Sequence, residues 1–397
     1  MPKVIYLDNN ATTAVAPEVR EAMEPFLGDL YGNPSSMHTF GGQVARHVDD
    51  ARARLAELLG ADPSEIIFTS CGTESDNAAI RSALATNPER RHIITTRVEH
   101  PAVRNLCQAL GLPGVGRTHY RVTELAVDSQ AMLNLADLER AIDDDTAVVS
   151  IMWANNETGV MFPVEEIGAL CRRKGVLFHT DAVQAVGKIP INLSKLPIDM
   201  LSLSGHKLHA PKGVGALYVR RGTRFSPFII GGHQENNRRG GTESVPLVVA
   251  LGKAAELAAR NMEAENTKVR ALRDRLEKEI LASAPAAMVN GHPGRRLPNT
   301  TNISFEYVEG EAILLMLDQH GVCASSGSAC TSGSLEPSHV LRAMGVPFTA
   351  AHGSIRFSLS IYNTEEEMDT VIKVLPPIIK RLREISPFGR ERLAARV

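Results

Sequence analysis

The stretch from Val176 to Val219 reads VLFHTDAVQAVGKIPINLSKLPIDMLSLSGHKLHAPKGVGALYV and contains three short apolar runs separated by polar loops. VLFHT, MLSLS and VGALYV have the length and composition of buried strands. Further apolar runs occur at 66–69, 92–96 and 147–153, and helical stretches at 74–84, 101–110 and 163–175 lie between the runs. Such alternation predicts an α/β fold with a largely parallel sheet, which binds ligands at the carboxyl ends of its strands.

The C-terminal part of the chain follows a different pattern. Residues 246–284 have a helix-forming composition throughout, which predicts one long helix, or two in series, leading to a smaller domain. We expect strands there near 301–307 and 354–360, with helices near 309–320 and 364–384. The charged stretch 262–279 is interpreted as a solvated helix face, with a partner surface as the alternative. The expected division is an N-terminal segment (1–15) packed with the small domain, a large domain (16–250), and a linking helix with the small domain (251–397).

Composition excludes several classes of protein. The 397 residues are 43% hydrophobic and 22% charged, with a formal net charge of −2, so nucleic-acid and anionic-membrane partners are not expected. We expect neither a secretory signal nor a membrane span, because residues 1–13 lack a charged start followed by an apolar run and no segment approaches about 18 uninterrupted apolar residues. Five scattered cysteines, odd in number, favour a reducing cytoplasm over a disulfide framework. The absence of CxxC and HExxH motifs makes a structural zinc site unexpected.

Two polar residues follow successive predicted strands. Asp181 comes directly after VLFHT, and Lys207 lies just after MLSLS. Pyridoxal phosphate requires a lysine for its aldehyde and a carboxylate for its pyridinium nitrogen, which must stay protonated if the ring is to accept electrons. A lysine at a strand end is by itself more often a solvated surface residue. Together with Asp181, however, Lys207 is a candidate for this cofactor's anchor.

A phosphate site is suggested by TSCGTESDNAAI (69–80), which runs from a predicted strand through Gly72 into a helix. We expect Thr73 to be the N-cap of that helix. Free backbone N–H groups and the helix dipole make such a helix start an anion site, although most threonine caps only cap a helix. Combined with Lys207 and Asp181, the pattern indicates one cofactor.

These motifs identify a family resemblance. The chain resembles a cysteine desulfurase of the NifS/IscS family, among the class V, fold-type I pyridoxal-phosphate enzymes, and is closest to the nitrogen-fixation branch. The resemblance implies a mainly parallel seven-stranded sheet flanked by helices, plus a smaller α+β domain. The stretches that carry it are YLDNNATT (6–13), GNPSSMH (32–38), SCGTESDN (70–77), VEHPAV (98–103), ANNETG (154–159), HTDAVQAVGK (179–188), SGHKLHAPKGVG (204–215), GGHQENNRRGGTE (231–243) and SSGSACTSGS (325–334).

The resemblance also implies roles for individual residues around the cofactor. Lys207 would form a Schiff base with it, Asp181 would pair with the pyridine nitrogen, and Gln184 would bond the ring hydroxyl. His100 would stack on the ring and act in proton transfer. The remaining cofactor contacts implied are Asn155 beside the ring hydroxyl and Gly72, Thr73, Ser204, Gly205 and His206 around the phosphate.

Three further residues complete the implied site. Thr242 would reach the phosphate of a neighbouring subunit, which implies a homodimer. Arg356 and Asn33 are the candidates for the substrate carboxylate, and Arg356 also suits it chemically because a guanidinium binds a carboxylate through two hydrogen bonds. Simpler interpretations stay open: His100 could be a turn or capping residue, Arg356 an ion-pair partner, and Asn33 and Gln184 ordinary loop and helix surface.

Cys330 lies in a stretch of small residues, SSGSACTSGS, which offers no apolar surface to bury a thiol. The resemblance implies that Cys330 takes sulfur from L-cysteine as a persulfide, releases alanine, and passes the sulfur to a scaffold protein of the NifU/IscU type. A transient iron–sulfur cluster held through Cys330 is the one metal role considered. Cys323, where the family usually has another residue, is expected to be a buried strand thiol.

The function expected from the resemblance is therefore a cytoplasmic, homodimeric cysteine desulfurase that supplies iron–sulfur cluster assembly, including that of nitrogenase. Within enzymes the alternative is a selenocysteine lyase, which would share the cofactor. An aminotransferase is less favoured because it has no use for Cys330. From another class, the alternative is a sulfur-carrier or scaffold-binding protein that kept the fold without turnover.

Overall fold

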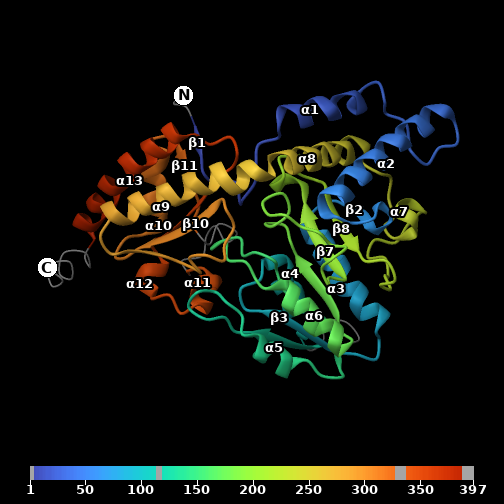
Figure 1. Ribbon diagram of the computed structural model, residues 1–397, viewed down its shortest axis with the longest axis horizontal. Coiled ribbons are helices and arrows are strands. Elements are labelled where there is room, and N and C mark those ends of the chain that lie inside the picture. The colour runs from blue at the N-terminus through green and yellow to red at the C-terminus, as the bar shows by residue number, and fades with distance from the viewer. Residues whose placement is uncertain (1–3, 113–118, 327–336, 387–397) are drawn as a thin grey trace.

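The computed structural model describes residues 4–112, 119–326 and 337–386, arranged as a large and a small domain (Figure 1). Cys330 lies outside these residues. The large domain contains a seven-stranded sheet. From one edge to the other its strands are β2 (Ile66–Thr69), β8 (Gly215–Val219), β7 (Met200–Ser204), β6 (Leu177–Asp181), β5 (Thr146–Ser150), β3 (His92–Thr96) and β4 (Arg121–Leu125).

Only β8 runs against its neighbours in this sheet; the pairings among β7, β6, β5, β3 and β4 are parallel. The predicted α/β class and mainly parallel sheet are thus confirmed, and six of the strands fall on predicted apolar runs. Sequence reasoning missed β4. Its residues RVTEL lie at the sheet edge and are mostly half-exposed, so they show no buried apolar run.

Alternate residues of each strand pack on opposite faces of the sheet. Ile66 and Phe68 join the core on one face, beside α2 (Thr39–Leu59), α6 (Val164–Lys174) and α8 (Val245–Ala264). Ile67 joins the core on the other face, beside α3 (Gly72–Thr86) and α4 (Pro101–Gly111). Each fully buried Ile or Phe stabilises the fold by roughly 1.5–3 kcal/mol, so the two cores hold the strand ends rigidly.

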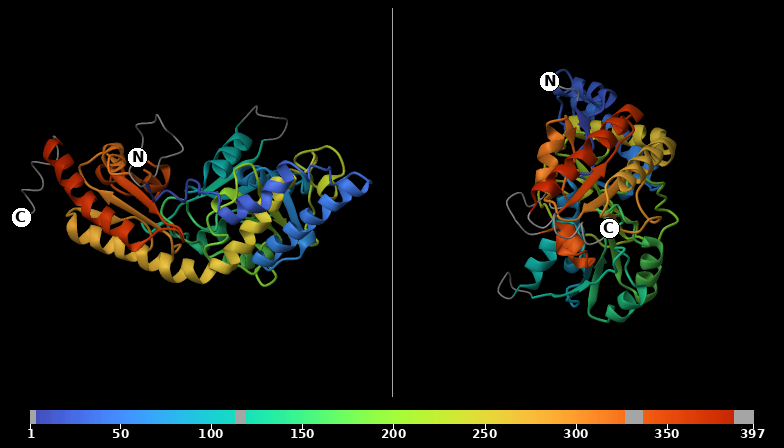
Figure 2. Two further views of the ribbon diagram at one scale, coloured as in Figure 1. Left: turned by 90° about the horizontal axis from the view of Figure 1, so that it is seen from above. Right: turned by 90° about the vertical axis from the view of Figure 1, so that its left-hand side faces the viewer.

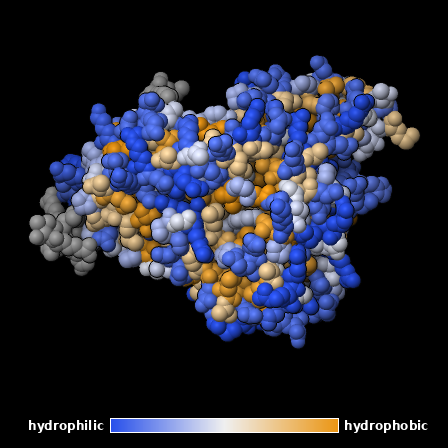
Figure 3. All heavy atoms as spheres, viewed as in Figure 1, coloured by the Kyte–Doolittle hydropathy of each residue, from blue (hydrophilic) through white to orange (hydrophobic). Residues whose placement is uncertain are grey.

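One long helical path joins the two domains. Helix α8 continues through a π-helical turn, Glu265–Val269, into α9 (Arg270–Ser283), and Figure 2 shows it running beneath both domains. The helical stretch predicted over 246–284 is thus present as two helices in series. Leu257 still packs in the large core, whereas Val269 packs in the small one, and we propose that the domain boundary lies between them. Hydrophilic side chains cover α9 and α13 (Glu365–Ile385) on the face seen in Figure 3, as a solvated helix face requires.

The small domain is built on β10 (Thr300–Phe305), which pairs antiparallel with β9 (Ala287–Val289) and β12 (Ser354–Ser358). The N-terminal strand β1 (Ile5–Tyr6) pairs in parallel with β11 (Val322–Cys323). Ile5 and Leu7 thereby belong to the small domain's core. The other helices are α1 (Pro17–Met23), α5 (Leu135–Ala141), α7 (Gln234–Asn237), α10 (Gly310–Asp318), α11 (His339–Ala343) and α12 (Phe348–Ala351).

The start of α3 differs from the prediction. The N-cap residue is Cys71, and Thr73 lies inside the first turn, so the expected threonine cap was wrong. Glu74 performs part of the capping instead, because its Oε2 accepts a hydrogen bond from the backbone N–H of Ser70 at 2.7 Å. Within the described residues, no helix is long and apolar enough to cross a membrane.

Candidate active site

A cavity of about 790 Å³ opens where several strands of the large sheet end. Its walls include residues that follow β2, β3, β5, β6 and β7, together with residues of the N-terminal segment and the small domain. In α/β sheets this edge is the usual ligand site, because loops from neighbouring strands converge there. The predicted site residues that line the cavity are Gly72, Thr73, His100, Asp181, Gln184, Ser204, His206, Lys207 and Arg356.

Lys207 ends a 3₁₀ turn, Gly205–Lys207, directly after β7. Its Nζ donates hydrogen bonds to the backbone oxygens of Asn10 at 2.5 Å and Ala11 at 2.6 Å. The N-terminal segment is held there in turn, because Thr13 donates both its N–H and its hydroxyl to the His206 carbonyl. The amine of Lys207 therefore lies at the cavity wall in a defined position rather than in solvent.

Asp181 is buried and His100 is half-buried, and both lie close enough to Lys207 for their charges to interact. Asp181 Oδ1 accepts a hydrogen bond from the backbone N–H of Val183 at 2.9 Å. Burial raises the pKa of the Asp181 carboxyl, while His100, the Val183 N–H and Lys207 oppose the rise. Burial lowers the pKa of His100, which favours its neutral form. Since His100 Nδ1 accepts from the Ala102 N–H and caps α4, its proton is on Nε2.

The cavity has features that fit a phosphate. Gly72 begins α3, where free N–H groups attract anions. A side chain at Gly72 could not fit, since a Cβ there would lie 2.8 Å from Val183 Cγ2. Facing this helix start, the buried Ser204 Oγ has no hydrogen-bond partner among the described residues. An unpartnered buried hydroxyl beside a helix N-terminus is a ready donor for a phosphate oxygen.

His206 and Gly205 support the same wall. His206 Nδ1 lies 3.1 Å from Thr12 Oγ1, and burial together with neighbouring lysines lowers its pKa to about 4, so the imidazole is neutral. Gly205 donates its N–H to the Val214 carbonyl at 2.9 Å. These contacts fix the loop that carries Lys207. The donor set of this cavity, an amine, a carboxyl, a neutral imidazole and a phosphate cradle, fits pyridoxal phosphate.

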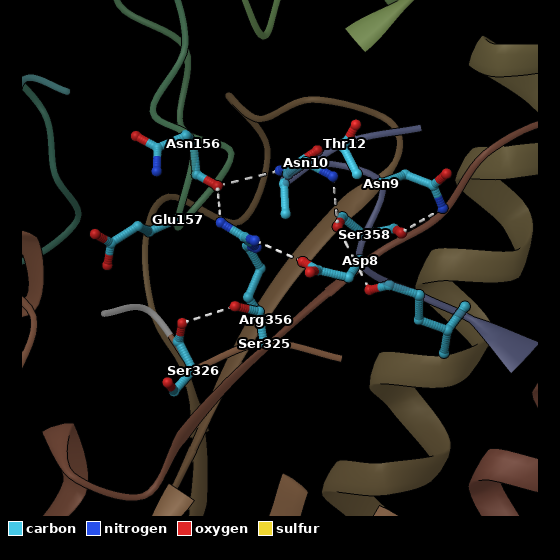
Figure 4. Close-up of polar contacts among 12 residues, drawn as sticks. Asp8, Asn9, Asn10, Thr12, Asn156, Glu157, Ser325, Ser326, Arg356 and Ser358 are labelled. Atoms are coloured by element: carbon cyan, nitrogen blue, oxygen red, sulfur yellow. Dashed lines mark hydrogen bonds and ion pairs between the residues drawn. The ribbon is translucent and has the colours of Figure 1, made fainter. Parts of the chain in front are cut away.

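Arg356, on β12, forms an ion pair inside the cavity wall. Its Nη2 donates to Asp8 Oδ1 at 2.7 Å and its Nη1 donates to the Asn156 carbonyl at 3.1 Å (Figure 4). The guanidinium is 4% exposed and the Asp8 side chain 20%. Two of the simpler interpretations are therefore confirmed, because Arg356 is an ion-pair partner and His100 is a helix cap, and neither contact is incompatible with the roles the resemblance implies.

Four predicted site residues among those described do not line the cavity, and one of them, Gly205, supports its wall as described above. Asn155 is fully buried, and its Oδ1 accepts from the N–H groups of Glu157 and Thr158, so it stabilises its own turn. Asn33 is exposed, and its Oδ1 accepts from the Ser35 N–H. Thr242 is exposed as well. Asn155, Asn33 and Thr242 do not lie together at one site within the single chain.

Sequence reasoning missed several polar residues of the cavity, including Asn10, Asp76 and Glu157. Burial and the nearby Asp181 carboxylate raise the pKa of Asp76 well above its usual range. His179, 3.6 Å away, is kept neutral because burial lowers its pKa to about 3. The anion is therefore favoured on Asp181, which has Lys207 close by. The motifs YLDNNATT and SCGTESDN contain Asn10 and Asp76, but motif matching alone gave them no role.

Metal ligands do not gather in the described ranges. Among residues 4–112, 119–326 and 337–386, no group of three or more His, Cys, Asp or Glu side chains is placed to hold a metal ion. Cys107 and Cys171 are buried, and Cys71 and Cys323 are partly exposed. Cys323 is thus a strand thiol, as expected, but only partly buried.

The fold and this donor set define a pyridoxal-phosphate enzyme of the class-V type. The chain belongs to the class-V aminotransferase family, whose model matches residues 5–371. Pyridoxal phosphate is the cofactor of this family.

Individual relatives narrow the comparison. The chain is 63% identical over 388 residues to cysteine desulfurase 2 of Trichormus variabilis, covering 98% of this chain and 96% of that protein. It is 60% identical to the cysteine desulfurase NifS of Azotobacter vinelandii, covering 97% and 94% of the two chains. A solved NifS-like protein superimposes with a TM-score of 0.89 at 39% identity, covering 96% of this chain and all of that one.

Proposed function

We propose that this protein is a cysteine desulfurase, which converts L-cysteine to L-alanine and transfers the sulfur to Cys330 as a persulfide. The observation that carries the proposal is the meeting of Lys207, Asp181 and the phosphate cradle of Gly72 and Ser204 around one cavity. Relatives that share about three-fifths of the sequence over almost its whole length are named cysteine desulfurases.

The chain's own residues have distinct tasks in this reaction. Pyridoxal phosphate, when bound, supplies an electron sink for the bonds at the substrate's α-carbon. Lys207 would hold it covalently and, once released, move the α-proton. Asp181 would keep a proton on the ring nitrogen, because its carboxylate is the favoured anion of the buried pair with Asp76. His100 would lie against the ring and exchange a proton through Nε2.

Arg356 would bind the substrate carboxylate. Its Nε is buried and has no hydrogen-bond partner among the described residues, while Nη1 and Nη2 contact Asn156 and Asp8. A guanidinium presents five N–H donors, so Arg356 can take a further carboxylate if Asp8 yields. This arrangement would place the α-carbon of L-cysteine near Lys207.

Cys330 itself lies outside the described residues, but both flanks of its segment contact the cavity. Ser325 pairs with the backbone of Arg356, and Ser338 Oγ donates to Glu157 Oε2 at 2.5 Å. Burial raises the pKa of Glu157 to about 7. A thiol between these two anchors is within a short chain length of the proposed substrate site, which supports Cys330 as the sulfur acceptor.

The proposal includes a homodimer. Large apolar side chains are exposed in two parts of the large domain, and Thr242 and Asn33, outside the single-chain cavity, lie close to them in sequence. Exposed apolar patches of this kind mark protein interfaces. The side chains concerned are Leu27, Tyr31, Met37, Phe228 and Ile230. A second copy would cover them and let Thr242 reach the phosphate site of its partner.

The sulfur would pass from Cys330 to a scaffold protein of the NifU/IscU type for iron–sulfur cluster assembly, including that of nitrogenase. The name of the Azotobacter relative supports the nitrogen-fixation branch.

The deciding experiment incubates the purified protein with L-cysteine and a thiol reductant, and assays alanine and sulfide together. Both products should form in equal amounts. Cys330→Ala should bind L-cysteine but release neither product, whereas Cys323→Ala should stay active. Equal product release by Cys330→Ala would disprove the assignment of the sulfur acceptor. Selenocysteine, offered in parallel, should be no better a substrate than L-cysteine.

A further inference from the structure

Lys188 is a buried lysine that lies next to the cofactor site without lining it. It is 5% exposed and ends the turn that follows Asp181. Gly187, with φ +77°, lets the chain make this turn, and a Cβ there would lie 2.3 Å from Leu208 Cδ2. Lys188 Nζ donates to Gln184 twice, to the backbone oxygen and to the side-chain Oε1, each at 3.3 Å.

The contact with Lys188 decides how the Gln184 amide is oriented. An ammonium group has three donors and no acceptor, so it requires Oε1, rather than the NH₂ group, to face it. The NH₂ group is then turned to the other side, where Nε2 donates to the Asn10 carbonyl at 3.0 Å. The same carbonyl accepts from Lys207 Nζ. Gln184 therefore presents a donor, not an acceptor, on the side of the catalytic lysine.

This orientation depends on Lys188 keeping its proton. The pKa of Lys188 is lowered to about 8, mainly by burial; Glu265 opposes this by raising it, and Arg356 contributes a smaller lowering. Lys188 in turn acts on His206 and His209, which burial keeps neutral. A carboxylate on Glu265 is thus the group that favours the ammonium form.

Glu265 is positioned for this by the junction between the domains. It is 7% exposed, and its Oε2 accepts no hydrogen bond from the described residues. Glu265 and Lys188 line one small cavity of about 30 Å³, which is room for a single bridging water. Glu265 begins the π-helical turn between α8 and α9, and the next residue, Asn266, donates from Nδ2 to the Lys188 carbonyl at 2.9 Å. Such π-turns recur at functional sites.

We propose that Lys188 is a positioning residue: held by Glu265, it fixes the Gln184 amide so that its NH₂ group is presented to the ring oxygen of the cofactor. The proposal rests on the proposed function, because it assumes that pyridoxal phosphate occupies the main cavity on Lys207. A purely structural pair at the domain junction would stabilise the fold but leave the cofactor's electronic state unchanged. The two roles predict different measurements.

The test follows the absorbance of the holoenzyme as a function of pH, which reports the proton on the Schiff base of Lys207. A donor at the ring oxygen stabilises negative charge there most strongly after that proton has left. Losing the donor should therefore raise the midpoint of this pH titration, which is the pKa of the Schiff base. For Lys188→Met we expect a rise of roughly one to two pH units, as for loss of one hydrogen bond to a charged oxygen.

Three further variants make the test specific. Glu265→Gln should raise the midpoint in the same direction by a smaller amount, because Lys188 then loses its proton more easily. Lys188→Arg keeps a side chain with donors only, and it should restore a midpoint near that of the wild type. Lys278→Met is the matched control: this lysine is exposed on α9, the helix that continues from the π-turn, and its charge does not act on Glu265 or Lys188. It should leave the midpoint unchanged.

An unchanged midpoint in Lys188→Met, with only a lower melting temperature, would overturn the proposal. If Lys188→Met does not fold, the same test is applied to Glu265→Gln: an unchanged midpoint in that variant would overturn the proposal. The proposed function is tested separately by alanine and sulfide release from the wild type. Shifted midpoints in a protein that releases no sulfide would refute the desulfurase and leave the role of Lys188 intact. Sulfide release with unshifted midpoints would support the desulfurase and refute the role of Lys188.

Discussion

Asp8 and Arg356 form an ion pair that ties the N-terminal segment to strand β12 within the small domain, with Asp8 Oδ1 2.7 Å from Arg356 Nη2. The two residues are 348 positions apart in the chain. The guanidinium proposed to bind the substrate carboxylate therefore already holds a carboxylate of the protein. Asp8 is the more exposed partner, so it is the one that can yield when substrate enters.

Replacing Asp8 should therefore favour substrate. For Asp8→Asn we expect the KM for L-cysteine to fall roughly threefold to tenfold at unchanged kcat, because a competing negative charge is removed. Steady-state kinetics on L-cysteine measure this. Asp369→Asn, which removes one partner of the exposed Arg275 ion pair, is the control and should change neither constant. A higher KM in Asp8→Asn would mean that Asp8 orients Arg356 rather than competing for it.

Arg356→Lys tests the other partner. A lysine offers a point charge in place of two parallel donors, so the KM should rise about tenfold or more. Cofactor content, read from the visible absorbance, should stay at the wild-type level, since Arg356 is not part of the phosphate cradle. A loss of cofactor would show that Arg356 contributes to cofactor binding, which would contradict its assignment to the substrate carboxylate.

Ser204→Ala should separate cofactor affinity from stability. Its hydroxyl is buried without a partner among the described residues, so the cofactor-free protein should lose little or no stability. A hydrogen bond to a charged phosphate contributes about 1.5–3 kcal/mol, so cofactor release should be roughly tenfold faster or more. Ser202→Ala is the control on the same strand, since Ser202 Oγ bonds His179 instead. Equal release rates in all three proteins would rule out a phosphate contact for Ser204.

The fold was predictable because its signals are local. Apolar runs such as 200–204 and the long helical stretch after Pro246 depend only on neighbouring residues, and both were found where expected. The strand β4 was missed because an edge strand can remain polar. The order of the strands, with β8 inserted against its neighbours, depends on pairing between distant segments, so spacing alone could not predict it.

The candidate site was predictable only where one local sequence motif is enough to indicate that a residue contacts the cavity. Asp181 and Ser204 each end a strand, Lys207 follows one, and all three were found at one cavity. The ion pair of Arg356 with Asp8 joins opposite ends of the chain, so no local pattern reveals it. The orientation of Gln184 depends on a buried lysine whose sequence context looks like an ordinary turn.

Asp181→Asn should keep the cofactor but lose most turnover. The amide cannot keep a proton on the ring nitrogen, so kcat should fall by roughly a hundredfold or more, as when other fixed charges are removed from active sites. Borohydride should still attach the cofactor to the peptide containing Lys207. Asp199→Asn is the matched control: its carboxylate accepts from the Phe178 N–H at 2.8 Å and lies outside the cavity, so kcat should change little. Turnover near the wild-type level in Asp181→Asn would contradict the role of this carboxylate.

The buried Glu99 should make stability fall as pH rises. Burial raises its pKa from 4.5 to about 8, even though Thr96 and the Met152 N–H stabilise the anion. Between these values the folded protein binds more protons than the unfolded chain, so the stability contribution present below pH 4.5 is lost as the pH rises through about 8.

Glu99→Gln mimics the protonated acid and should lessen this loss. Melting temperatures measured from pH 5.5 to 8.5 should decline less steeply in the variant than in the wild type. A residual slope is expected from Glu157, whose pKa is raised to about 7. Parallel curves for the two proteins would show that Glu99 is already ionised in the native state.

The first residues of the chain join its last strand in the finished site. Asn9 and Asn10 contact Ser358, and the Asn10 carbonyl accepts from Lys207. During synthesis on the ribosome, the N-terminal segment must therefore wait unpaired until β11 and β12, more than 300 residues further along, have emerged. The cofactor pocket cannot close on an incomplete chain. Cofactor capture thus reports that synthesis has passed β12, and products truncated before β12 should leave the ribosome without a functional pocket and be open to proteolysis.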